Sequence, residues 1–356
     1  MTHQNEESNT SSGWRLPALD GVRGVAALSV LVGHAAQEAG SDGRTLIGAW
    51  LRYGGQGGVV LFFVLSGFLL FLPWLKPHPP TFRVYAARRC LRIMPAYYVS
   101  VLAMALFFRP GAVPILFHLL FLPSFTFTLL PVYWTLQVEE FFYWSLPVLA
   151  MVVKRFGAGL TVAFSVVLSV VYASAVLRVV PPKYWFLLLS QTPFYLPAFA
   201  GGLAAAVAWR RGVKLRWAAL SAPFSYLLVA PIAEHYRFVS ATVVGAKIAL
   251  PISNLVLVPG VVALVLSAAG GAQEWLAARP LRFVGKISFS LYLWHYVVIK
   301  YVPIPTALSH SVIARVAHAL IFSLPIAYLG HRFVEMPFLK LRPGSPAESS
   351  VVPSIP

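Results

Sequence analysis

The stretch "ALDGVRGVAALSVLVGHAAQ" (residues 18–37) is apolar enough to cross a membrane, yet it carries the ionisable residues Asp20, Arg23 and His34. A transmembrane helix needs about 20 mostly apolar residues. Ionisable side chains are costly inside a bilayer unless they are paired or face a wet cavity. The stretch therefore predicts a membrane helix whose three ionisable groups have partners or a function.

The composition of the whole chain agrees with this prediction. Of its 356 residues, 58% are hydrophobic and only 11% are charged, and the mean hydropathy is +0.75. A soluble globule of this size cannot bury so much apolar surface. We expect an all-α polytopic membrane protein with one membrane domain at 14–342. The segments 1–13 and 343–356 are rich in polar residues and proline and are predicted to be disordered tails.

Hydropathy predicts about ten membrane-spanning helices. They lie near 17–36, 55–75, 93–109, 133–153, 158–178, 185–208, 217–233, 245–268, 287–304 and 311–331. The first resembles a cleavable signal peptide after Arg15, but Asp20 and Arg23 interrupt its core, which favours an uncleaved helix. The apolar segment 113–130 is predicted to be a re-entrant or interfacial helix broken at Pro123, because counting it as a span would invert every later loop.

The net charge of +17 is distributed unevenly between the predicted loops. Every second gap is basic, and with Arg15, Arg23 and Lys76 these gaps hold 19 of the 28 Lys and Arg residues. The positive-inside rule then places both termini in the cytoplasm and the chain in the cell (cytoplasmic) membrane. We therefore expect the lipid bilayer as a partner, and no nucleic acid.

The ionisable groups of the first helix share one face. Arg23 and His34 are eleven residues apart, which is about 16 Å of helix rise and close to three full turns. Asp20 lies three residues before Arg23 and joins them. Two interpretations remain open from the residues alone: Asp20 and Arg23 pair near the interface while His34 is a satisfied core histidine, or the three form a functional polar stripe.

Six blocks of the sequence together resemble the membrane-bound acyltransferase 3 family. The first joins Arg23 to His34, and a later one holds the Arg-x-x-Arg arrangement of Arg89 and Arg92. The blocks, in the order of that family, are "LDGVRGVAALSVLVGHA" (19–35), "LFFVLSGFLL" (61–70), "RRCLR" (88–92), "WTLQVEEFFY" (134–143), "GKISFSLYLWHYVV" (285–298) and "HRFVEMPFLKL" (331–341). Thr135 stands where Ser is usual, which keeps a hydroxyl, and Phe289 stands where Tyr is usual, which loses one.

This resemblance implies an integral-membrane O-acyltransferase. Members modify hydroxyl groups of surface glycans, antibiotics and other small molecules, so the expected acceptor is a glycan, a lipid-linked sugar or a secondary metabolite. No large hydrolase-like domain follows the last predicted span, which implies the stand-alone form. A multi-pass transporter with a His/Arg/Glu proton relay is the alternative, but no internal repeat of the kind usual in transporters is found.

Acyl transfer from a thioester to an alcohol needs a base and a stabiliser for the oxyanion. His34 is the predicted general base, because an unperturbed imidazole titrates near neutral pH. Glu139 is predicted to orient His34, the alternative being a structural hydrogen bond, and Glu140 is expected at the membrane interface. Arg23 is the third predicted catalytic residue; it binds a donor phosphate or positions a carbonyl oxygen, or it only neutralises Asp20.

The predicted substrate-binding residues are spread over four helices. Ser66 is a candidate oxyanion donor or acyl carrier, although Ser66 and Gly67 also suit close helix packing. Trp294 and His295 line an acceptor cavity or form a packed hydrogen bond. The full predicted set is Asp20, Ser66, Trp134, Tyr292, Trp294 and His295. No metal site is expected.

Arginines in the basic gap between the second and third predicted spans predict the donor. Arg88, Arg89 and Arg92 suit the phosphates of coenzyme A, because a guanidinium binds phosphate bidentately. A topology signal or lipid contact would explain the same charges. We expect acyl-CoA, with acetyl-CoA favoured, as a co-substrate entering from the cytoplasm, and no permanently bound cofactor.

Overall fold

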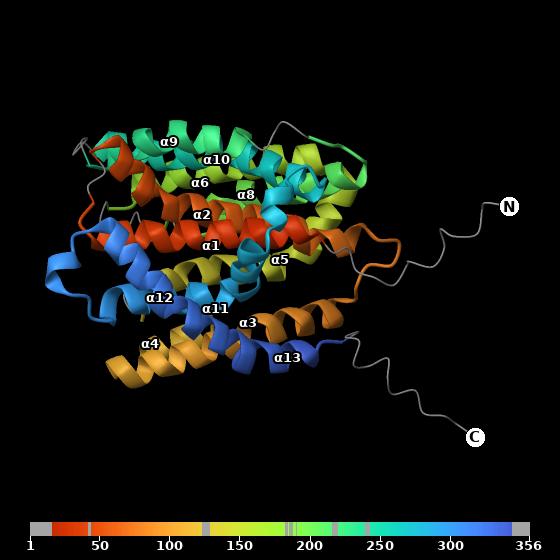
Figure 1. The fold of residues 1–356 in the computed structure, drawn as a ribbon. Helices are drawn as coiled ribbons and strands as arrows, with labels where there is room; N and C mark the ends of the chain where they lie inside the picture. The colour runs from red at the N-terminus through yellow and green to blue at the C-terminus, as the bar shows by residue number, and fades with distance from the viewer. Residues whose placement is uncertain are drawn as a thin grey trace, which may run out of the picture.

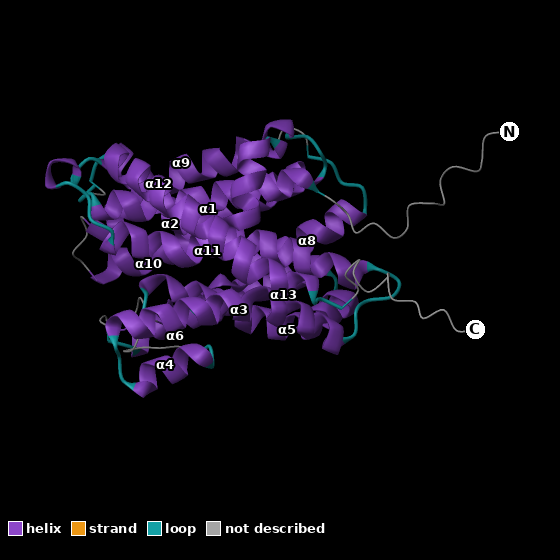
Figure 2. Ribbon diagram, turned by 60° about the horizontal axis from the view of Figure 1, so that its bottom comes forward, coloured by secondary structure: helices purple, strands orange, loops and turns teal. Residues whose placement is uncertain are grey.

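The structure is a computed structural model that describes residues 16–41, 44–122, 129–181, 184, 188–189, 191–215, 220–238 and 243–343, without the side chains of 234–238 and 243–252. The described residues form a helical bundle and include no strand (Figure 1, Figure 2). The prediction of an all-α chain is therefore confirmed.

Ten helices of 18 or more residues account for most of the described chain, and each overlaps one predicted span. They are α1 (Pro17–Glu38), α2 (Leu46–Phe71), α3 (Phe82–Phe108), α5 (Trp134–Phe156), α6 (Ala158–Val179), α8 (Thr192–Arg210), α9 (Ser221–Phe238), α10 (Val243–Ala269), α11 (Arg279–Tyr301) and α12 (Val312–Gly330). Six of the described helices, namely α1, α2, α3, α5, α6 and α12, are long and apolar enough to cross a membrane. The chain is thus a membrane protein, while the number of spans and the side of the termini stay predictions.

The segment 113–130 contains one short helix, α4 (Ala112–Leu119). Eight residues rise only about 12 Å, too little to cross a bilayer. The predicted break at Pro123 lies outside the described residues, as do the predicted tail 1–13 and all but the first residue of the tail 343–356.

Capping residues stabilise the first turns of the helices that carry the candidate site. The Thr45 hydroxyl accepts a hydrogen bond from the Gly48 amide at the start of α2, and Thr81 does the same for Val84 at the start of α3. Pro17 and Pro280 occupy the first turns of α1 and α11, where a missing N–H costs nothing.

The centre of the bundle is built from α1, α2 and α11 (Figure 1). Helices α1 and α11 run parallel: Gly285 of α11 contacts the Asp20 carbonyl at one end, and Lys300 bonds Glu38 at the other. A Cβ at Gly285 would lie 1.8 Å from the Asp20 carbonyl oxygen, so only glycine permits this approach. The two backbones are therefore in direct contact along the face that carries Arg23 and His34.

Arginines gather at one end of the bundle. The start of α3, the start of α1 and the segment after α13 (Met336–Lys340) meet at one end, where Arg88 donates to the Pro343 carbonyl and Arg23 lies near Arg92. We call Arg23, Arg88, Arg89 and Arg92 the arginine end. Its position agrees with the predicted alternation of basic gaps.

Candidate active site

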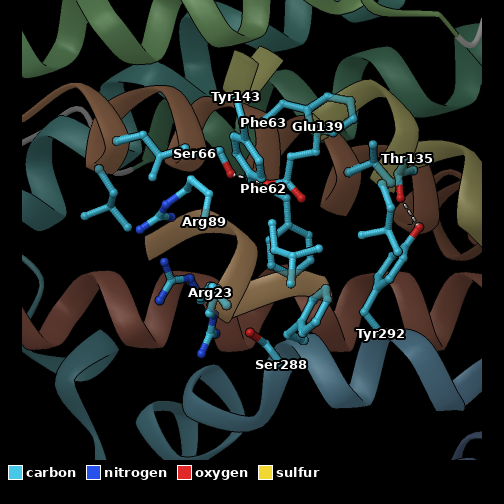
Figure 3. A pocket seen from close by; sticks show the side chains of 17 residues that line it. Arg23, Phe62, Phe63, Ser66, Arg89, Thr135, Glu139, Tyr143, Ser288 and Tyr292 are labelled. Atoms are coloured by element: carbon cyan, nitrogen blue, oxygen red, sulfur yellow. Dashed lines mark hydrogen bonds between the residues drawn. The ribbon is translucent and has the colours of Figure 1, made fainter. Parts of the chain in front are cut away.

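A cavity with a volume of about 110 Å³ lies between α1, α2, α3, α5 and α11 (Figure 3). Figure 3 shows arginines at one end of this cavity, Thr135 and Tyr292 at the other, and Ser66 and Glu139 between them. Its polar lining consists of Arg23, Ser66, Arg89, Arg92, Thr135, Glu139, Tyr143, Ser288 and Tyr292. Apolar side chains such as Phe62 and Phe63 complete the walls.

Three guanidinium groups face the arginine end of the cavity. Arg92 pairs with Glu335 at 3.1 Å, whereas Arg23 lies 3.7 Å from Asp20, a long ion pair between partly exposed side chains. The buried Nε atom of Arg89 has no hydrogen-bond partner among the described residues. This end of the cavity is therefore suited to an anionic group that the three arginines would share.

Glu335 supports the arginine end from behind. Its carboxylate accepts hydrogen bonds from the Ser290 amide (3.1 Å) and hydroxyl (2.6 Å), and lies 3.2 Å from the His331 ring. Because it also pairs with Arg92, it joins α3 and α11 to the π-helical turn His331–Glu335 after α12. The closing block of the sequence thus has a structural role at the site.

Glu139 occupies the middle of the cavity and is hydrogen-bonded to α2. The Ser66 hydroxyl donates to its Oε1 atom at 2.5 Å. Gly67, next to Ser66, packs so closely on α8 that an added Cβ would lie 2.3 Å from the Phe199 carbonyl oxygen. Close helix packing, one of the two interpretations of this block, therefore applies to Gly67, whereas Ser66 faces the cavity.

Two hydroxyl groups close the far end of the cavity. The Tyr292 hydroxyl donates to the Val132 carbonyl at 2.8 Å and lies 2.5 Å from the Thr135 hydroxyl. The same tyrosine ring lies 5.6 Å from the ring of His295, between centroids. Tyr292 therefore separates the cavity from the histidines.

His34 and His295 form a contact that we call the histidine end. The Nδ1 atom of His34 lies 2.9 Å from Nε2 of His295, and the two rings stack with centroids 5.1 Å apart. His295 is buried, whereas His34 is partly exposed and touches the edge of Tyr296. Neither histidine lines the cavity, and His34 as a whole residue is only partly buried.

The hydrogen bonds fix the tautomers of the two neutral rings. His295 Nδ1 lies 2.8 Å from the Tyr292 carbonyl and 3.1 Å from the Leu291 carbonyl, both of which only accept, so Nδ1 carries the proton. His295 Nε2 must then accept, and His34 Nδ1 must donate to it. The Nε2 atom of His34 keeps a free lone pair and has no hydrogen-bond partner among the described residues.

The predicted pairing of His34 with Glu139 is wrong in this structure, because His295 occupies the position next to His34. The reason is that Glu139 and His34 lie at different depths in the bundle. Thr135 lies level with Tyr292, and Glu139 follows one helical turn further from the histidines, beside Ser66. His295, predicted to bind substrate, instead contacts the candidate base.

Other predicted residues fall into two groups. Arg23, Ser66, Arg89, Arg92, Glu139 and Tyr292 line the cavity, as the sequence suggested for a common site. Asp20, Arg88, Trp134 and Trp294 do not line it. Trp294 lies near Gly330 of α12, and Trp134 packs on Tyr195 with centroids 5.5 Å apart, so apolar packing takes both rings away from the cavity. Arg88 bonds the Pro343 carbonyl, and the carbonyl of Asp20 packs on Gly285.

Three hydroxyl groups of the cavity were missed from the sequence. Glu140, expected at the membrane interface, is only 5% exposed within the protein, and its depth in the membrane stays a prediction. Tyr143, Ser288 and the Thr135 hydroxyl line the cavity. The signal was present, because all three lie in the family-like blocks at helical spacing from Glu139 or Tyr292.

Fold and cavity together define an all-α membrane protein with a histidine pair and an arginine-lined cavity. The acyltransferase domain family matches residues 16–332, and the chain belongs to this family. The membership of this family predicted from the sequence blocks is thereby confirmed.

Three relatives show the range of this likeness. A putative acetyltransferase, ORF330, of Acidianus two-tailed virus is 29% identical over 67% of this chain and 71% of its own length. The peptidoglycan O-acetyltransferase OatA of Listeria monocytogenes is 24% identical, covering 91% of this chain and 56% of the relative. The putative peptidoglycan O-acetyltransferase YrhL of Bacillus subtilis is 26% identical, covering 90% and 54%. The chain thus spans about half the length of these two bacterial relatives. No solved structure matches it.

Proposed function

We propose that the chain moves an acyl group, with acetyl favoured, from acyl-CoA to a hydroxyl group of a glycan or small-molecule acceptor, with His34 Nε2 as general base. The observation that carries this proposal is one polar path through the bundle. It runs from the arginine end, through Ser66 and Glu139, to Tyr292 and the histidine end. A phosphate-binding group and a base thus lie at opposite ends of one route.

The arginine end suits the phosphates of the donor. Arg23 and His34 are separated by about 16 Å along α1, a distance that an extended pantetheine arm covers. Arg23 is therefore too far from His34 to hold the reacting carbonyl, which leaves phosphate binding as its role. The cavity holds only about 110 Å³, so the arm must displace the contact between Tyr292 and Thr135 to reach the histidines.

The histidine end suits the proton transfer. His34 Nε2 takes the proton of the acceptor hydroxyl while the oxygen of that hydroxyl attacks the thioester carbonyl carbon. The carbon–sulfur bond then breaks, and the coenzyme A thiolate leaves with the proton that His34 returns. During this step His295 Nε2 keeps accepting from His34 Nδ1, which stabilises the imidazolium and holds the ring.

The two hydroxyl groups at the boundary are the nearest donors for the developing oxyanion. Tyr292 and Thr135 bond each other and the Val132 carbonyl. A thioester carbonyl arriving there would accept from the Tyr292 hydroxyl in place of the Val132 carbonyl. Preorganised donors of this kind stabilise the transition state more than the ground state.

The acceptor and the membrane follow from the relatives and the charge pattern. Two of the relatives are named peptidoglycan O-acetyltransferases, which supports a hydroxyl-bearing glycan as the acceptor class. The basic gaps support a cytoplasmic membrane with the arginine end facing the cytoplasm. Acyl-CoA would enter from that side, and the acceptor would approach the partly exposed His34 from the other.

The test uses membrane vesicles that contain the full chain, radiolabelled acetyl-CoA and peptidoglycan fragments or other surface glycans. We expect His34→Ala to lower ester formation by about 10³-fold, within the range of general base catalysis. The matched control is His310→Ala, an exposed histidine outside the cavity and the histidine end. Ester formation by His34→Ala at the wild-type rate would overturn the mechanism. Transport of label without any ester would indicate a transporter.

A further inference from the structure

The segment that follows α13 lies against the arginine end. Arg88 donates two hydrogen bonds, from Nε (3.1 Å) and Nη2 (2.9 Å), to the Pro343 carbonyl. Helix α13 itself packs on α3. Arg342, next to Pro343, is thereby held beside the start of α3, although about 250 residues separate the two in the sequence.

The side chain of Arg342 has buried atoms without partners. Its Nε and Nη2 atoms are buried and form no hydrogen bond with any described residue, and the Nε atom of Arg89 is in the same state. A buried charged donor without a partner costs more free energy than an ordinary lost hydrogen bond. Two neighbouring arginines with this deficit indicate a site that is complete only with an acceptor.

The local charge points to an anion. Among the described residues, the one ion pair within the group Arg88, Arg89, Arg92 and Arg342 joins Arg92 to Glu335. Burial, followed by the like charges of Arg92, Arg89 and Arg88, lowers the pKa of Arg342 from its usual value to about 9. Repulsion of this kind is relieved when an anion lies between the guanidinium groups.

We propose that Arg342 forms, with Arg88, Arg89 and Arg92, a phosphate-binding site of its own behind the cavity, and that it holds a phosphate group of the coenzyme A donor. This inference rests on the proposed function. A lipid headgroup offers the same phosphate chemistry. The donor is favoured because the unpartnered atoms are buried and because Arg89 and Arg92 also line the cavity that leads to the histidines.

The first experiment measures binding without turnover. The purified full-length protein in neutral detergent is titrated with coenzyme A, dephospho-coenzyme A and inorganic pyrophosphate. We expect Arg342→Gln to weaken binding of coenzyme A about tenfold, the size of one lost charge-assisted hydrogen bond. The matched control, Arg332→Gln, changes an exposed arginine at the same end and should leave binding unchanged. Equal affinities of the two variants would overturn the proposal.

Three further measurements separate the remaining explanations. The melting temperature of each variant shows whether it is folded, and Arg342→Lys keeps the charge, so it should recover part of the affinity. Vesicles with and without an anionic phospholipid identify the source of the phosphate. A variant that loses only its response to that lipid, with unchanged coenzyme A affinity, would overturn the assignment to the donor. Binding by the wild type without acetyl transfer would contradict the proposed function and leave the phosphate site standing.

Discussion

The histidine end and the arginine end of the polar path are built in opposite ways. At the histidine end, two rings from parallel helices contact each other, and three of their four nitrogen atoms are hydrogen-bonded within the described residues. At the arginine end, four guanidinium groups from α1 and α3 gather, and the buried Nε of Arg89 has no hydrogen-bond partner among the described residues.

This difference shows what each end can recognise. A single free lone pair at a fixed position suits the transfer of one proton. Several forked cations with spare donors suit a group with delocalised negative charge, such as a phosphate. Variants at the two ends should therefore change different kinetic constants, and this separation is open to test.

The largest change in turnover is expected from substituting His295, the residue that contacts the proposed base His34. We expect His295→Ala to lower kcat by about 10²-fold with an unchanged KM for acetyl-CoA, because His34 loses the acceptor that fixes its tautomer. Initial rates at varied acetyl-CoA concentration in vesicles measure both constants. His295→Gln, which restores an acceptor, should recover part of kcat. A rise in the donor KM alone would place His295 at the donor site instead.

At the other end, Arg89→Gln should raise the KM for acetyl-CoA about tenfold and leave kcat within about twofold. The reason is that a phosphate contact bound equally in the ground and transition states changes binding and not turnover. The same kinetic series measures both constants. The control is Arg83→Gln, which changes an exposed arginine near the start of the same helix. A fall in kcat with constant KM would remove the distinction between the two ends.

The smallest effect is expected at the boundary between the ends. Tyr292→Phe removes one hydroxyl that bonds Thr135 and Val132, and a net hydrogen bond is worth about 1 kcal/mol. We expect kcat to fall about fivefold and the donor KM to stay constant. An increase in kcat would show that the hydroxyl acts as a barrier to the donor and gives no help to the oxyanion.

Hydropathy predicted where the long helices lie, but it placed some of their starts too late. Helix α2 begins at Leu46, nine residues before the predicted span, because "YGGQGG" (53–58) looks unlike a helix. One of these glycines lets α1 approach closely: a Cβ at Gly58 would lie 2.6 Å from the Ala26 carbonyl oxygen. Helix α3 begins at Phe82, within the basic gap, and two of the arginines of that gap, Arg89 and Arg92, line a cavity inside the protein.

The sequence predicted many residues that line the candidate site, but it did not predict which of them contact each other. Arg23, Ser66, Arg89, Arg92, Glu139 and Tyr292 do share one cavity. The partner of His34 was not predictable, because the relative depth of α1, α5 and α11 depends on how their backbones pack. Contacts such as Gly285 on the Asp20 carbonyl set that depth, and one sequence does not reveal them.

The parallel packing of α1 and α11 has a consequence for biosynthesis. The two histidines are 261 positions apart, and α11 is the second-last of the long helices that the structure describes. A nascent chain that has not yet emerged past residue 279 carries the first imidazole without the second. The contact between the two rings can then form only after α11 has been made, when eight other long described helices have already been made.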